Sequence, residues 1–117
     1  MHDYTRLDVW WEARRCARLV YELTDELPRA ETFGLRSQMR RAAISIASNV
    51  AEGAGRSSDR DFARFIEFAT GSAAELETQL LIASDVALLD QRRTDDLIVY
   101  LRSLRRRLEA LRTAILP

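Results

Sequence analysis

The sequence predicts an all-α fold, an antiparallel up-down four-helix bundle formed by a single domain over residues 1–117. Glycine and proline are sparse, with four and two residues, so the chain holds few of the residues that interrupt helices. Apolar residues recur at spacings of three and four over four long segments, which is the period of a helix with one buried face. The segments between them are short, so consecutive helices are expected to lie side by side.

The first two predicted helices cover about residues 9–27 and 35–52. Pro28 ends the first, because a residue that precedes proline disfavours helical geometry. The second lies between Gly34 and Gly53, and Gly53 is expected to end it in the left-handed conformation. The many alanines of the second helix imply close approach to a neighbour. The expected apolar faces are Trp10, Ala13, Ala17, Val20 and Leu27 in the first helix, and Leu35, Met39, Ala42, Ala43, Ile46 and Val50 in the second.

The third and fourth predicted helices cover about residues 59–89 and 95–116. Ser58 is expected to cap the third, and Thr94, which is followed by two aspartates, is expected to cap the fourth. The fourth helix repeats leucine at alternating spacings of four and three, as in a heptad seam. The expected apolar faces are Phe62, Phe65, Ala69, Ala73, Leu76, Leu80, Ala83 and Ala87, followed by Leu97, Leu101, Leu104, Leu108, Leu111 and Ile115.

Composition excludes several kinds of functional site. Eighteen arginines balance eighteen acidic residues and there is no lysine, so attraction to nucleic acid has to come from local patches. Cys16 is the only cysteine, which rules out an intrachain disulfide and a cysteine-based zinc site. His2 is the only histidine, which removes most mechanisms that need a histidine beside a nucleophile.

These absences predict a protein without enzymatic activity, metal or cofactor. Di-metal sites in helical bundles use Glu-x-x-His pairs, and no predicted helix carries a histidine. No stretch approaches the roughly 18 consecutive apolar residues that span a bilayer, and the first residues lack the pattern of a signal peptide. We therefore expect a cytoplasmic protein with no membrane partner.

The third predicted helix has a second apolar face, about a third of a turn from its core face. Such a face is unusual in an isolated bundle, whose helices are polar on the outside. A widened core would explain it, and self-association would explain it better. The expected interface residues are Ile44 on the second helix and Phe68, Gly71, Ile82 and Val86 on the third.

A polar stripe borders the apolar face of the second helix. Ser45, Asn49 and Glu52 form it, and the third helix offers Ser72, Glu75 and Gln79 as partners. The favoured interpretation is a structural hydrogen-bond network that fixes the register of the two helices. A catalytic pair of Glu52 and Glu75 is the alternative, but no nucleophile or electrophile accompanies these two carboxylates.

The arginines are spread unevenly. Residues 92–112 hold seven arginines and three acidic residues, whereas residues 59–90 hold two arginines and seven acidic residues. Complementary charge between the two helices is one interpretation, and a phosphate-binding surface is the other. The arginines expected in such a surface are Arg102, Arg105 and Arg106, with Arg36, Arg40 and Arg41 as further candidates.

Several segments resemble the four-helix-bundle family that is encoded in intervening sequences of bacterial 23S rRNA genes. The sequence is similar as well to the accessory protein of diversity-generating retroelements. The resemblance covers about residues 7–90, and the fourth helix matches in pattern alone. It is carried by LDVW at residues 7–10, FGLRSQMRRA at 33–42, SIASNVAEG at 45–53, RS at 56–57, DFxxF at 61–65 and GSxxELETQL at 71–80.

The resemblance implies a homopentameric ring of four-helix bundles and a role with nucleic acid. It also implies a reverse transcriptase as a possible partner, because the retroelement relatives associate with one and bind nucleic acid through basic surfaces. We therefore expect a non-enzymatic oligomeric protein that binds RNA or DNA through arginine patches. The alternative is a protein–protein scaffold or adaptor that binds no nucleic acid.

Overall fold

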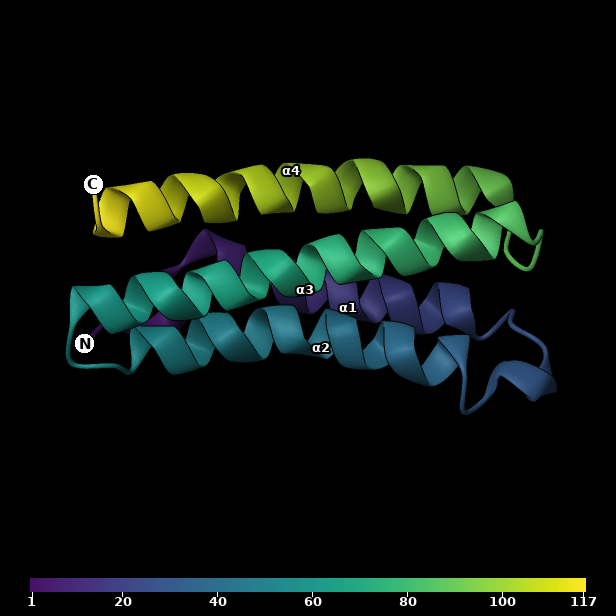
Figure 1. Ribbon diagram of the computed structural model, residues 1–117, viewed down its shortest axis with the longest axis horizontal. Coiled ribbons are helices and arrows are strands. Elements are labelled where there is room, and N and C mark those ends of the chain that lie inside the picture. Colours follow the sequence, from purple (N-terminus) through teal and green to yellow (C-terminus); the bar gives the residue numbers. More distant parts are fainter.

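The computed structural model describes residues 1–117 as four long helices that lie side by side (Figure 1). The helices are α1 (Asp8–Thr24), α2 (Leu35–Ala54), α3 (Asp59–Asp85) and α4 (Gln91–Ile115), with short 3-10 turns η1 (Tyr4–Arg6) and η2 (Arg29–Glu31). Each helix packs against its neighbours in sequence and α1 also contacts α4, whereas α1 does not touch α3 and α2 does not touch α4. The expected all-α antiparallel four-helix arrangement is therefore confirmed. Both termini lie at one end, opposite the η2 turn.

The core lies along the bundle axis and follows the predicted apolar faces. The largest fully buried side chains come from all four helices and include Val20, Met39, Ile46, Phe62, Ile66, Leu76, Leu80, Leu101, Leu104 and Leu108. Several predicted members of the core, among them Trp10, Ala17, Leu111 and Ile115, are partly buried at its margin. Burying large aliphatic side chains of this kind contributes about 1.5–3 kcal/mol each.

Close contact between α2 and α3 depends on small residues. A Cβ at Gly53 would lie 2.7 Å from the Cβ of Phe65 and 3.3 Å from the backbone oxygen of Phe62. The expectation that Gly53 stops the helix in a left-handed conformation is wrong, because no glycine has positive φ and α2 continues to Ala54. The glycine is required for the close approach of the two helices.

The first helix ends earlier than expected, at Thr24 rather than near Leu27. The hydroxyl of Thr24 donates to the backbone oxygen of Val20 at 2.7 Å, and residues 25–27 form a turn that still buries Leu27. Arg36 on α2 donates to the backbone oxygens of Thr24 and Leu27. A side chain from the next helix thus satisfies carbonyl groups that the end of α1 leaves without a partner.

The connection from α3 to α4 also differs from the expectation. Helix α3 ends at Asp85 because Ala87 adopts a left-handed conformation with φ of 56°. Ala87 is therefore exposed and is not part of the core. Asp90, not Thr94, caps α4, since its carboxylate accepts the Arg93 N–H at 2.9 Å. Thr94 is buried within the first turn, where its hydroxyl donates to the Asp90 backbone oxygen at 2.7 Å.

Two glycines provide a matched test of the α2–α3 contact. Glycine to alanine in a helix normally stabilises by up to about 1 kcal/mol. We expect this gain for Gly71→Ala, because nothing lies within 4 Å of the added Cβ. Gly53→Ala should instead lower the free energy of unfolding by about 1–3 kcal/mol through overpacking. Urea unfolding at several protein concentrations, extrapolated to low concentration, measures the free energy of unfolding of both variants. Equal stabilisation by the two substitutions would contradict the close packing at Gly53.

Candidate functional site

The polar network between α2 and α3 forms around three of the predicted residues. The hydroxyls of Ser45 and Ser72 share a hydrogen bond of 2.8 Å across the two helices. The Asn49 amide donates to both the backbone oxygen and the hydroxyl of Ser45, each at 2.9 Å. All three residues are half-buried, so these hydrogen bonds are partly protected from water and fix the register of α2 against α3.

Glu52 and Glu75 do not join this network. Glu52 is exposed and pairs with Arg56 one turn further along the chain, at 2.7 Å. Glu75 is exposed and forms neither a hydrogen bond nor an ion pair. The two carboxylates are also remote, because Gly53 lies beside Phe65, about ten residues before Glu75 in α3. The structural role expected of Glu52 is therefore wrong, and the two glutamates form no acid–base pair.

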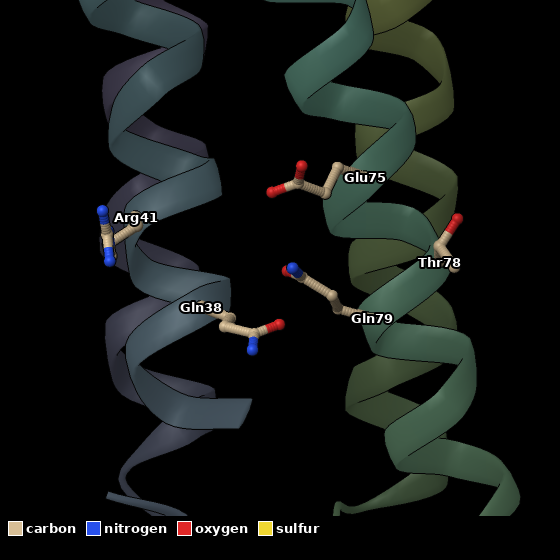
Figure 2. A pocket seen from close by; sticks show the side chains of 5 residues that line it. All are labelled: Gln38, Arg41, Glu75, Thr78 and Gln79. Atoms are coloured by element: carbon tan, nitrogen blue, oxygen red, sulfur yellow. The ribbon is translucent and has the colours of Figure 1, made fainter. Parts of the chain in front are cut away.

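A shallow groove of about 570 Å³ opens between α2 and α3, lined by Gln38, Arg41, Glu75, Thr78 and Gln79 (Figure 2). The Gln79 side chain lies between the two helices and is 8% exposed, and its Oε1 atom is buried without accepting a hydrogen bond. Such an atom costs about 1–3 kcal/mol. Arg41 and Glu75 border the groove from opposite helices, and neither has an ion-pair partner within the chain. The groove thus offers one cation, one anion and one buried acceptor.

The predicted second apolar face lies on the outside of the bundle. Phe68, Ile82 and Val86 are 48%, 47% and 56% exposed, so they are not part of a widened core. On α3, Phe68 and Ile82 share a face with Glu75, which places them beside the groove, and Val86 follows the end of α3. Gly71 is exposed among them, with open space around it. We call Phe68, Gly71, Ile82 and Val86 the apolar stripe.

Ile44 is separate from the apolar stripe. Its side chain is 45% exposed. Ser45, the next residue, faces α3 through Ser72, and successive helical residues differ by about 100°. Ile44 therefore points away from α3, although it lies on the outside of the bundle as expected.

Three arginines of α4 contact acidic residues of α3. Arg102 donates to the Glu77 carboxylate at 3.1 and 3.2 Å, and Arg105 lies 3.4 Å from its other oxygen. Arg112 donates to Glu67 at 2.8 Å. Arg106 is exposed and has no such partner. The unequal charge of the two helices is therefore matched within the chain in part, and two guanidinium groups share a single carboxylate at Glu77.

Two of the three arginines proposed on α2 have a structural role instead. Arg36 donates to the carbonyl groups at the end of α1. Arg40 donates to the Thr24 hydroxyl at 2.9 Å and to Asp25 at 2.9 Å, and its guanidinium group lies 4.3 Å from the centre of the Tyr21 ring. These contacts occupy both arginines, which corrects the expectation that they bind phosphate. Arg41 alone is exposed and unpaired.

The single cysteine is inert in the folded chain. Burial raises the pKa of the Cys16 thiol to about 12, so almost no thiolate forms near neutral pH. Burial also raises the pKa of Tyr100, whose hydroxyl donates to the Glu12 backbone oxygen at 3.0 Å. No group of three His, Cys, Asp or Glu side chains is placed to hold a metal ion. None of the helices has the length and apolar character that crossing a membrane requires.

Sequence reasoning missed an exposed group of aromatic and arginine side chains on α1. Trp10 and Trp11 lie next to Arg14, and Arg15 lies over the Tyr100 ring. The signal is present in the sequence as two adjacent tryptophans followed one turn later by two adjacent arginines. The pattern is easily overlooked because Trp10 fits the spacing of the core face. Trp11 lies outside that face and suggests no role by itself.

The polar network generates a prediction with a matched control. Asn49→Ala should lower the free energy of unfolding by about 1–3 kcal/mol, because it removes two hydrogen bonds from a half-buried site. Glu52→Ala should change it by less than about 0.5 kcal/mol, because an exposed ion pair within one helix contributes little. Thermal unfolding of both variants is the measurement. If loss of Glu52 proved as costly as loss of Asn49, the assignment of the network would be wrong.

Residues 5–110 match the model of a family described as 23S rRNA-intervening sequence protein. No curated protein matches significantly. The matched region includes α1, α2 and α3 whole and most of α4, together with the α2–α3 groove and the apolar stripe. The chain therefore belongs to the 23S rRNA-intervening sequence protein family.

Proposed function

We propose that this chain is a non-enzymatic protein that assembles with copies of itself and binds RNA or DNA through arginine side chains. The observation that carries the proposal is the outer face of α2 and α3. There, the apolar stripe lies beside a groove with an unpaired cation, an unpaired anion and a buried acceptor. Large exposed side chains bordered by polar groups are typical of an interface between proteins.

A homopentameric ring is the assembly we propose. Neighbouring copies in a ring meet through two different patches, so each subunit presents one patch to each neighbour. Arg41 or Glu75 of one copy can then pair with a group of opposite charge on a different patch of the next copy. A hydrogen-bond donor from that copy can also satisfy the buried Oε1 atom of Gln79. Phe68 and Ile82 would be removed from water at the same contact, and Gly71 would allow the two backbones to approach closely.

Nucleic-acid binding is supported by the arginines that the fold leaves free. Arg41 and Arg106 are exposed and unpaired, and Glu77 is shared by two guanidinium groups, which leaves local positive charge on α4. An assembly repeats these groups in every subunit, so weak contacts add up when one nucleic acid spans several copies. The family description refers to a 23S rRNA sequence and names no ligand. A reverse transcriptase as partner is a proposal that rests on the resemblance alone.

The alternative function is a scaffold or adaptor that binds another protein and no nucleic acid. The ion pairs of Arg102, Arg105 and Arg112 with α3 favour it, because charges neutralised within the chain attract phosphate less strongly. Dependence on salt separates the two functions. Binding through phosphate contacts weakens steeply as salt rises, whereas an apolar contact does not.

Self-association gives the first prediction of this proposal. Sedimentation at micromolar concentration should show a species well above 13.4 kDa, with five copies as the expected assembly. Phe68→Asp should shift it towards monomer, because a carboxylate buried in an interface is costly. Val99→Asp is the control, because Val99 is 67% exposed on α4, away from this face. A parent protein that sediments as a monomer would refute the assembly.

Nucleic-acid binding gives the second prediction. Fluorescence anisotropy with RNA and DNA oligonucleotides should show weak binding that tolerates sequence changes and falls steeply with salt. Replacing Arg102, Arg105 and Arg106 by glutamine should weaken it at least tenfold. Thermal unfolding checks that the bundle stays folded, because this variant removes both cationic partners of Glu77. The control replaces Arg29, Arg60 and Arg92, three exposed arginines on separate elements, and loses the same net charge. If the affinity of the parent protein does not change with salt concentration, the scaffold function is favoured instead.

A further inference from the structure

We propose that the outer face of α1 is a contact site for single-stranded nucleic acid, in which Trp11 stacks on a base and arginines bind the flanking phosphates. This inference rests on the proposed function and names a surface for it. Trp11, Arg14, Arg15 and Arg18 line a shallow hollow of about 310 Å³. Their spacing of three, four and seven residues places them on one side of the helix.

Contacts within the chain hold Trp11 in place while leaving it open to solvent. Its indole N–H donates to the Thr5 backbone oxygen at 2.8 Å, which ties the ring to η1. The neighbouring Trp10 ring meets it edge-on with centroids 5.0 Å apart. Trp11 is nevertheless 51% exposed. An ordered aromatic ring whose polar atom is already satisfied offers its surface to an incoming base at little entropic cost.

The arginines around this ring lack strong partners. The Arg14 guanidinium lies 4.9 and 5.1 Å from the centres of the two tryptophan rings, which orients it without neutralising its charge. Arg15 lies 5.7 Å from the Tyr100 ring and has no ion pair. Arg18 lies 3.8 Å from Glu22, and both side chains are mostly exposed. Nearby Glu12 is already paired with Arg107. The α1 surface therefore keeps most of the positive charge of its arginines.

The chemistry favours a single strand over a duplex. Guanidinium groups bind phosphate oxygens in a two-pronged geometry. A stacking ring needs an accessible base face, which a single strand offers and a double helix conceals. No side chains arranged to recognise base edges accompany the ring, so we expect binding that tolerates changes of sequence.

The test uses the full-length protein and fluorescein-labelled 20-nucleotide strands of uridine RNA and thymidine DNA, with a mixed-sequence DNA duplex of equal length for comparison. Fluorescence anisotropy is measured from low to moderate salt. Trp11→Ala should weaken binding to both single strands about tenfold and leave the salt dependence unchanged, because stacking involves no phosphate. Replacing Arg14, Arg15 and Arg18 by glutamine should weaken binding and lower the slope of log K against log salt by about 2.

Weaker binding could also result from a loss of net charge, from unfolding or from a loss of assembly. Three controls separate these causes from the loss of stacking on Trp11. Trp11→Phe keeps a stacking ring and should retain most of the binding. The glutamine variant of Arg29, Arg60 and Arg92 loses the same charge elsewhere and should bind better than the α1 variant. Thermal unfolding and sedimentation of each variant report its fold and assembly. If Trp11→Ala changed the assembly without changing affinity per subunit, the face would be an interface between copies and the inference would be overturned.

The outcomes also separate this inference from the proposed function. If the α1 variants bind like the parent while the α4 variant loses binding, the inference is wrong and the proposed function stands. If the parent binds neither the single strands nor the duplex, both the inference and the proposed binding of nucleic acid are wrong. If the duplex binds as tightly as the single strands, base stacking on Trp11 is refuted. The supporting result is a loss of binding in the α1 variants that exceeds the loss in the Arg29, Arg60 and Arg92 control, with single strands preferred over the duplex.

Discussion

The close approach of α2 and α3 determines what the rest of the molecule can present to its surroundings. The two backbones meet at Gly53, where even one added carbon atom would collide with Phe65. Ser45 and Ser72 share a hydrogen bond further along the same contact, which fixes one helix against the other. Phe68 and Ile82 occupy positions of α3 outside the core face and therefore remain exposed. The apolar stripe lies beside this tightly packed contact.

The net charge is zero, but the arginines differ in the partners that their guanidinium groups contact. One kind has polar partners within the fold: Arg36 and Arg40 donate to groups at the end of α1, and Arg102 and Arg105 share the single negative charge of Glu77, which matches their charge in part. The other kind, represented by Arg14 and Arg15, lies against aromatic rings without a carboxylate partner. Cation–π contacts orient a guanidinium group and leave its charge available, whereas an ion pair cancels that charge for a distant phosphate. The partners of each arginine, and not the total charge, therefore decide where an anion can bind.

The periodicity of apolar residues is enough to predict four helices, their order and most of the core, because burial of one helical face is a local pattern. Helix ends are predicted less well. The left-handed Ala87 and the capping of α4 by Asp90 depend on backbone geometry that neither residue type demands. The use of Arg36 at the end of α1 could not be predicted, because it depends on a contact between residues far apart in the sequence.

The candidate site is predictable where it follows helical spacing. The apolar stripe and the contact of Ser45 with Ser72 follow from positions on one face of each helix. The role expected of Glu52 is wrong because a nearby Arg56 provides a simpler local partner. The sequence predicts Gln79 as a partner of the polar stripe. It does not predict that the Oε1 atom of Gln79 lacks a hydrogen bond, because hydrogen bonding depends on side-chain geometry.

The square arrangement of the helices makes the two proposed surfaces compatible with one another. Helices α1 and α3 lie on a diagonal and do not touch, so the outer face of α1 points away from the apolar stripe on α3. A contact that involves the apolar stripe and the α2–α3 groove would not itself cover Trp11 and its arginines. The proposed assembly would present the α1 surface once in every copy, and a flexible single strand could reach from one copy to the next. A rigid duplex follows such a curved series of sites only when it is bent, which costs free energy. The proposed assembly would thus strengthen the preference for single strands that the chemistry of the α1 surface already implies.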